Sequence, residues 1–353
     1  MHFMRLQRSV NRRWLSSSIL LIVLFFSVAC ASSSQSNASR PSSSPVVNNA
    51  ALPGQQIWKQ GASSFLFGTN DTQEWSDNNI ETNSGLQQDL KNAHFTLMRT
   101  FFFDKSLADG HATTDAEIEQ RLKTIENSGM TCLGVLHNIF NVSFDEHVVA
   151  YAGQRCQLYE FGNEPDYNNI PVTDYVQQWN KVIPILRHIN PKAKFIGPVV
   201  AYTLEYIQQF LTSVKASNVL PDAVSLHWYG CYQLSEEQCL TKASEIGSII
   251  PQVRQIMQET IGRDLPIGVS EWNFDSGNPP PSYGGDKNFI TQFTAQALQS
   301  MIQAGVTFAC QFDAASYSGY GALDMFDVNT NQPKSQYFAM ASVIAQYRPT
   351  GST

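Results

Sequence analysis

Two glutamates that each end an apolar segment are the residues of this chain best suited to chemistry. Glu164 ends the stretch 157–164 and is followed by Pro165, which cannot donate to a sheet ladder and therefore stops a strand. Glu271 ends a second apolar stretch, residues 266–271. Two carboxylates at two strand ends are suited to acid/base or nucleophilic work on a neutral, polar substrate.

The elements that must position these carboxylates are strands that alternate with amphipathic helices from residue 65 onward. The predicted strands are residues 65–70, 95–103, 131–139, 157–164, 194–201, 223–229, 266–271 and 306–312. Eight βα units over about 290 residues are typical of a single (β/α)8 barrel, a TIM barrel. A doubly wound open sheet is the alternative, but it more often opens with a glycine-rich phosphate turn, which residues 68–71 lack. No spare strands follow residue 312, so no accessory β-sandwich is expected.

The strand ends of such a barrel meet on one rim, and here they carry polar and aromatic residues. These residues are Arg99, His137, Asn163, Glu164, His227, Trp228, Tyr229, Glu271, Trp272, Gln311, Phe312 and Asp313. Side chains two apart share a face, so Ile267, Val269 and Glu271 are expected to point into the barrel together. Glu160 lies four residues deeper than Glu164 and needs a buried partner, for which Arg99 is the candidate.

These residues resemble the retaining glycoside hydrolases of clan A, the "4/7" barrels. Arg99, His137 and the triplet 227–229 match the pattern of family 5, whereas the segments 160–165 and 270–273 look more like families 39 and 79. The resemblance implies that Glu164 is the general acid/base, that Glu271 is the nucleophile and that Asn163 binds the 2-hydroxyl of the sugar. Many clan members have a Trp on strand eight where this chain has residues 311–313, so the choice of sugar stays open.

The expected reaction is hydrolysis of β-glycosidic bonds in an oligo- or polysaccharide with retention. Retention needs carboxyl groups roughly 5–5.5 Å apart, with the pKa of Glu164 raised and Glu271 ionised. Trp228 and Trp272, together with Trp75, are expected to stack on sugar rings. No metal or organic cofactor is implied. Two alternatives remain: transglycosylation by the same site, or a non-catalytic, surface-tethered carbohydrate-binding barrel.

The N-terminus predicts export. Residues 1–30 read as a signal peptide, with a basic segment, an apolar run and small residues before Cys30, which resembles the lipidated cysteine of a bacterial lipoprotein. An ordinary cleaved signal is the alternative. Residues 31–55 are rich in Ser, Asn and Pro and are expected to form a disordered tether, and residues 56–353 the catalytic domain. The protein is expected to be an extracellular monomer that meets the membrane only through this anchor.

The remaining composition narrows the partners and predicts two disulfides. The chain has 23 basic residues, four of them before residue 31, which leaves 19 against 30 acidic residues and argues against a nucleic-acid partner. An exported chain can form disulfides. Cys231 and Cys239 sit in one short loop, and Cys132 and Cys156 each open a predicted strand, so each pair is expected to bond. Cys310 is left as a buried thiol.

Overall fold

The computed structural model describes residues 52–71, 80–105, 110–276, 280–315 and 323–350. The chain divides into residues 1–46 and residues 47–353, and every described residue belongs to the second unit. The predicted signal peptide, Cys30, Trp75 and most of the tether lie outside the described residues.

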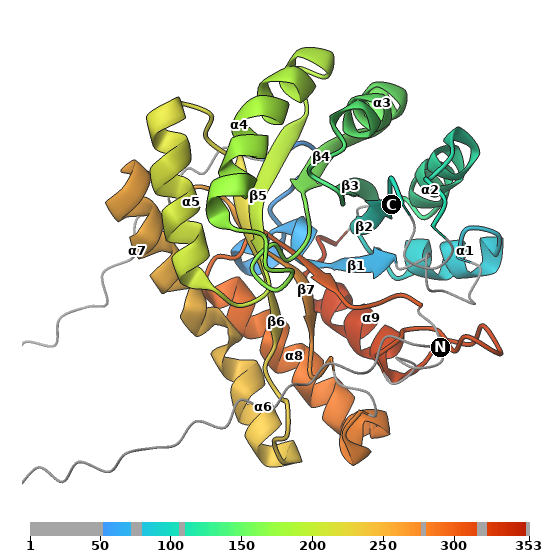
Figure 1. The fold of residues 1–353 in the computed structure, drawn as a ribbon. Helices are drawn as coiled ribbons and strands as arrows, with labels where there is room; N and C mark the ends of the chain where they lie inside the picture. Colours follow the sequence, from blue (N-terminus) through green and yellow to red (C-terminus); the bar gives the residue numbers. More distant parts are fainter. Residues whose placement is uncertain (1–51, 72–79, 106–109, 277–279, 316–322, 351–353) are drawn as a thin grey trace, which may run out of the picture. The chain divides into compact units, whose positions relative to one another are not determined.

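The second unit is a closed barrel of eight parallel strands that follow one another in sequence order, with helices outside the strands (Figure 1). The predicted (β/α)8 fold is therefore confirmed. The strands are β1 Gly68–Asp71, β2 Leu97–Phe102, β3 Thr131–Leu136, β4 Cys156–Phe161, β5 Lys194–Val200, β6 Ala223–Tyr229, β7 Ile267–Asn273 and β8 Phe308–Gln311. The described ranges contain no second sheet.

The helices follow the strands as the apolar spacing predicts. They are α1 Ser84–Asn92, α2 Asp115–Asn127, α3 Val142–Ala152, α4 Val172–Ile189, α5 Leu204–Ser217, α6 Glu236–Glu245, α7 Ile250–Ile261, α8 Lys287–Gln303 and α9 Ser335–Tyr347. Thr114 starts α2 with a capping box, in which its side chain and that of Glu117 bond each other's backbone N–H groups. The 3-10 turn Ile246–Ile249 separates α6 from α7, and Pro251 lies in the first turn of α7, where a proline is tolerated.

Apolar side chains fill the lower barrel interior. Leu97, Leu133, Leu158, Ile196, Ala223, Phe308 and Cys310 form this inner cluster together with Leu52 and Phe65. Gly268 makes room for it, because a Cβ at that position would come within 2.1 Å of the Phe308 ring. The interior is thus a packed core, and the functional groups lie above it.

The predicted common face of Ile267, Val269 and Glu271 is wrong. Ile267 and Val269 belong to the outer hydrophobic cluster, which contains apolar side chains of the helices. The register between β6 and β7 shifts by one residue: Leu226 is opposite Val269, but His227 is opposite Glu271. This irregularity turns Glu271 into the barrel although the apolar residues before it point outward.

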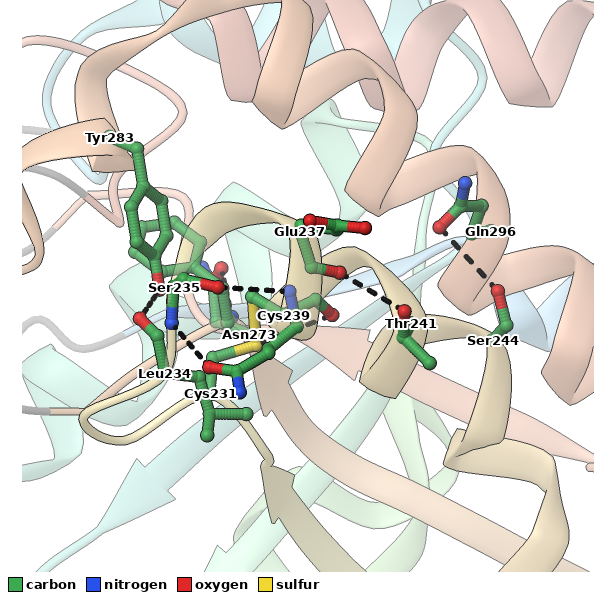
Figure 2. The surroundings of a disulfide bond; sticks show 12 residues. Cys231, Leu234, Ser235, Glu237, Cys239, Thr241, Ser244, Asn273, Tyr283 and Gln296 are labelled. Carbon is green, nitrogen blue, oxygen red and sulfur yellow. Dashed lines mark hydrogen bonds between the residues drawn. A yellow bond between two sulfur atoms is a disulfide. The ribbon is translucent and has the colours of Figure 1, made fainter.

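Both predicted disulfides are present. Cys132–Cys156 joins β3 to β4, where the two residues face each other in the strand register. Cys231–Cys239 closes the turn between β6 and α6, and Figure 2 shows Tyr283 reaching the Leu234 carbonyl beside it, with an Oη–O distance of 2.9 Å. Cys310 is free and buried, as predicted. None of the described helices has the length and apolarity that crossing a bilayer requires.

Candidate active site

A cleft of about 730 Å³ opens at the carboxyl ends of the strands. It is lined by Phe101, Asn163, Glu164, Tyr167, Ala201, Tyr202, His227, Trp228, Tyr229, Gly230, Ile249, Glu271, Ser276 and Phe312. These residues come from segments far apart in sequence that the barrel gathers on one rim, as expected for this fold. Glu164 and Glu271 are both among them.

Glu164 lies on a tight turn beyond β4. The strand ends at Phe161, four residues before Pro165, so the prediction that the proline stops it is wrong. Gly162 has φ +81° and Glu164 has φ +47°, a left-handed conformation that a glutamate rarely adopts. The backbone N–H of Glu164 donates to the Val199 carbonyl at 2.9 Å, which holds this turn against β5. Such constrained backbone is common where a functional side chain must be aimed.

Glu271 lies in β7, and its carboxylate is 7% exposed. Its Oε1 atom lies 2.6 Å from Nη1 of Arg99, and its Oε2 atom accepts a hydrogen bond from the hydroxyl of Tyr229 at 3.0 Å. A cation and a hydroxyl donor therefore hold one oxygen each of this carboxylate and fix its orientation.

Arg99 is a buried hub with no exposed surface. Besides Glu271 it binds Glu160, with Nε 2.6 Å from Oε2, and Asn163, with Nη2 2.6 Å from Oδ1. Its Nη1 also donates to Oδ1 of Asn70 at 2.9 Å. Burial disfavours the charged guanidinium, but the charges of Glu160 and Glu271 raise the pKa of Arg99 further. The predicted pairing of Arg99 with Glu160 is confirmed, and the same side chain also reaches the site above.

His227 lies between the two carboxylates. Its Nδ1 atom is 2.7 Å from Oε1 of Glu164 and 3.6 Å from Oε2 of Glu271. One oxygen of each glutamate and one nitrogen of His227 lie within 4.8 Å of one another. Among the described residues, this is the one group of three such side chains whose spacing could also hold a metal ion.

The pKa of Glu164 differs from the expected one. Burial raises it, but the hydrogen bond and the charge of His227, together with the charge of Arg99, outweigh burial and lower the pKa below the usual range. Burial lowers the pKa of His227, whereas the charge of Glu271 and the hydrogen bond that His227 donates to Glu164 raise it above the usual value. Both shifts favour an ion pair, with the proton on His227 rather than on Glu164 as expected.

The other predicted binding residues fall into two groups. Asn163, Tyr229 and Trp228 line the cleft, and the Trp228 ring stacks on Phe293 with 6.1 Å between centroids. His137 follows β3 and packs against Phe103 at 4.6 Å between ring centroids, outside the residues that line the cleft. Burial lowers the pKa of His137.

The expectation that Trp272 stacks on a sugar ring is wrong. Its side chain has no exposed surface and stacks on Phe293 of α8, with 6.3 Å between centroids. It follows Glu271 in the strand and therefore points to the opposite face, toward the helices. A ring in that place is unavailable to a ligand in the cleft.

Tyr167 and Tyr202 are two aromatic residues of the cleft lining that the sequence prediction missed. Tyr167 lies three residues after Glu164, and Tyr202 follows β5, whose end offered no charged or histidine side chain to draw attention. Both rings are largely exposed. The signal that could have found them is an aromatic residue just beyond a strand end on the same rim.

Comparison with known proteins identifies a glycosyl hydrolase family. The family model for a glycosyl hydrolase catalytic core matches residues 142–332. None of the curated proteins matches the sequence. The three solved structures that follow are at most 17% identical to this chain in sequence, so they show only that the fold is shared.

Three solved structures illustrate the similarity. A glucosidase from Croceicoccus marinus has a TM-score of 0.64 at 17% identity, with 84% of this chain and 69% of that chain covered. A GH39 enzyme from Xanthomonas axonopodis pv. citri has a TM-score of 0.62 at 14% identity, with 85% and 71% covered. A monomeric β-xylosidase from Caulobacter crescentus has a TM-score of 0.60 at 14% identity, with 80% and 68% covered.

Proposed function

This chain belongs to the family of glycosyl hydrolase catalytic cores and is a glycosidase, and on that premise we propose that it cleaves β-glycosidic bonds with retention. The substrate is an oligo- or polysaccharide. Glu271 acts as the nucleophile and Glu164 as the general acid/base.

The separation of the two carboxylates is the observation that carries this proposal. One oxygen of Glu164 and one of Glu271 lie within 4.8 Å of each other. Retaining enzymes hold their carboxyl groups about 5–5.5 Å apart, whereas inverting enzymes need roughly 6.5–9.5 Å to admit a water molecule. The spacing supports direct attack by a carboxylate over attack by a water on the opposite face of the sugar.

The surroundings support the division of roles. Glu271 is bound by Arg99 and by the Tyr229 hydroxyl, which orient its carboxylate for attack on the anomeric carbon. As its oxygen bonds to that carbon, the bond to the leaving oxygen breaks, and Glu164 donates a proton to that oxygen. In the second step Glu164 takes a proton from water, the water oxygen bonds to the anomeric carbon, and Glu271 is released.

His227 supplies the proton that Glu164 needs. The Nδ1–Oε1 line of 2.7 Å lets one proton move between the two groups. When a substrate covers the cleft and excludes water, burial favours the neutral carboxyl group over the ion pair. Glu164 then carries the proton beside the leaving oxygen.

The remaining residues bind sugar in this proposal. Asn163 takes the 2-hydroxyl, with its amide oriented by Arg99. Trp228 offers a partly exposed ring in the cleft. His137 lies outside the cleft lining, so its part is to pack the strand end rather than to touch the sugar.

We also propose that the protein is exported and tethered through Cys30. The two disulfides support an oxidising location. The test is to label the full chain with palmitate in the producing cell: wild type should take up label and remain with membranes, and Cys30→Ser should lose the label. Equal labelling of both would overturn the anchor.

The reaction is tested with a panel of β-linked glucans, xylans, mannans and galactans. Wild type and Glu271→Gln are compared by the new reducing ends they release, and NMR of the first product reports its anomeric configuration. Cleavage by wild type with a β product, and none by the variant, is expected. An α product would overturn retention, and binding without cleavage by either protein would make the barrel a binding module.

Two further measurements test the nucleophile and the acceptor. A mass shift of one glycosyl group on Glu271 after treatment with a 2-deoxy-2-fluoro glycoside of the cleaved sugar would identify the nucleophile. Product length separates hydrolysis from transfer: products longer than the substrate would show that a sugar hydroxyl replaces water and that the enzyme is a transglycosylase.

A further inference from the structure

Two tyrosines extend the cleft beyond Glu164. Tyr167 lies in the segment between β4 and α4, and Tyr202 lies between β5 and α5. Both line the cleft, yet Tyr167 is 62% exposed and Tyr202 is 68% exposed. Large aromatic surfaces left in water beside a functional cleft are typical of places where a ligand binds.

These tyrosines are held in the same frame as Glu164. The carboxylate of Asp166 accepts three backbone N–H bonds from the next loop: from Ala201 at 2.8 Å, from Tyr202 at 3.1 Å and from Thr203 at 2.9 Å. Together with the bond from the Glu164 N–H to the Val199 carbonyl, this ties the β4 loop to the β5 loop. The backbone that presents both rings is therefore positioned relative to Glu164.

The chemistry of the site gives this part of the cleft a direction. In the proposed mechanism Glu164 protonates the leaving oxygen, so the group that leaves must lie on the side of Glu164. Tyr167 is three residues from it, and the loop of Tyr202 is bonded to the same turn. The sugar that is attacked must lie against Glu271, the proposed nucleophile.

We propose that Tyr167 and Tyr202 form a leaving-group subsite that stacks on a sugar ring. The substrate therefore has sugar units on both sides of the cleaved bond, as an oligosaccharide or polysaccharide does, rather than a small alkyl leaving group. Sugar rings present apolar faces that pack on aromatic side chains. This inference rests on the proposed function and adds to it the requirement for a leaving sugar.

The test compares substrates that share the attacked sugar but differ in the leaving group. The probes are xylobiose, cellobiose and β-1,4-galactobiose, each paired with the β-fluoride of the same sugar, which leaves as fluoride and brings no ring to the subsite. The pair that wild type cleaves is used for kcat/KM. The measured quantity is the ratio of kcat/KM for the disaccharide to kcat/KM for the fluoride.

Variants that lose the tyrosine ring are compared with a variant that keeps it. In Tyr167→Ala and in Tyr202→Ala the ratio should fall about tenfold, whereas in Tyr202→Phe, which keeps the ring, it should stay within a factor of two of wild type. Tyr232→Ala is the matched control, because Tyr232 is also 62% exposed but is absent from the cleft lining, and its ratio should not change.

The possible results separate the two proposals. An unchanged ratio in both Ala variants, or an equal fall in Tyr232→Ala, overturns the subsite while leaving the glycosidase reaction in place. If wild type cleaves neither these probes nor any of the β-linked glucans, xylans, mannans and galactans, the proposed function itself fails and the subsite falls with it. If it cleaves only the longer chains, the same ratio is measured with the tetrasaccharide of the cleaved polymer and the β-fluoride of its disaccharide.

Discussion

The Nδ1 atom of His227 lies 2.7 Å from the Oε1 atom of Glu164, a distance at which one proton can pass between the two side chains. The charge and hydrogen bond of His227 outweigh burial and lower the pKa of Glu164. The nearby carboxylates outweigh burial and raise the pKa of His227. With the pKa of Glu164 lowered and that of His227 raised, we expect the pair to keep its last proton until the pH exceeds the usual pKa of a histidine.

This sharing predicts the basic limb of the pH profile. The acid is active while the pair holds its last proton, so kcat/KM should fall as pH rises through the raised pKa of His227. In His227→Gln, Glu164 must keep its proton unaided, and the limb should move to lower pH. Profiles of kcat/KM for both proteins check this, and a limb at the same pH in both would assign it to another group.

Tyr229 stabilises the charge of Glu271 through one hydrogen bond of 3.0 Å. Tyr229→Phe should lower kcat about 10- to 100-fold, because a hydrogen bond to a charged group contributes about 1.5–3 kcal/mol. The ring is kept, so the temperature of unfolding should stay close to that of wild type.

Tyr206→Phe is the control for this change. The Tyr206 hydroxyl donates to the backbone carbonyl of Ile170 at 3.1 Å and touches neither glutamate. Its kcat should stay within a factor of two of wild type. An equal loss in both variants would show that the effect of Tyr229→Phe comes from packing.

Arg99 neutralises two buried carboxylates, so its removal should destabilise the barrel. Arg99→Met leaves Glu160, which has no exposed surface, without its partner, and the free energy of unfolding should fall by about 3–5 kcal/mol. Arg99→Lys should also be destabilised, because an ammonium cannot reproduce the forked contacts.

The double variant Arg99→Met with Glu160→Gln tests the cause. It removes the buried charge that the single variant leaves unpaired, and it should recover part of the lost stability. Urea unfolding of the three proteins measures this. A double variant no more stable than Arg99→Met would show that shape, and not charge, sets the loss.

Asp145 predicts a second pH dependence, of stability rather than activity. It is fully buried in α3, and burial, together with the charges of Asp104 and Glu146, raises its pKa to about 8. Within the part of the chain that is described, neither of its carboxylate oxygens has a hydrogen-bond partner. The folded protein therefore keeps the acid protonated well above the pH at which the unfolded chain loses that proton.

The sign follows from the direction of this shift. A raised pKa in the folded state contributes stability below the pKa of an unfolded Asp, near 3.9, and this contribution is lost as pH rises toward about 8. Asp145→Asn imitates the protonated form, so its free energy of unfolding should exceed that of wild type by an amount that grows between about pH 5 and about pH 8. Glu237→Gln, on α6, is the control, because its side chain is exposed and is not among the groups that shift the pKa of Asp145. A pH-independent difference between Asp145→Asn and wild type would refute the prediction.

The order of the elements and the resemblance to glycoside hydrolases could be read from the sequence. Short apolar runs and helical spacing are local properties, so the sequence predicts the eight βα units, and the structure agrees. The structure also agrees with both predicted disulfides and with the expected gathering of Glu164, His227 and Glu271. The family match confirms the resemblance. About ten positions carried that resemblance. They could be recognised because they lie at strand ends, and each strand end is specified by a few neighbouring residues.

Only the tertiary structure decided how these residues meet. The extra residue in β7 turns Glu271 inward and leaves Trp272 against α8, and a change of register between two strands has no local signature in either of them. The lowered pKa of Glu164 and the reach of Arg99 to Glu271 depend on distances across the barrel. Tyr167 and Tyr202 join the site only because Asp166 binds the neighbouring loop. Electrostatics and loop contacts act through space between distant segments, so they appear only when the barrel is closed.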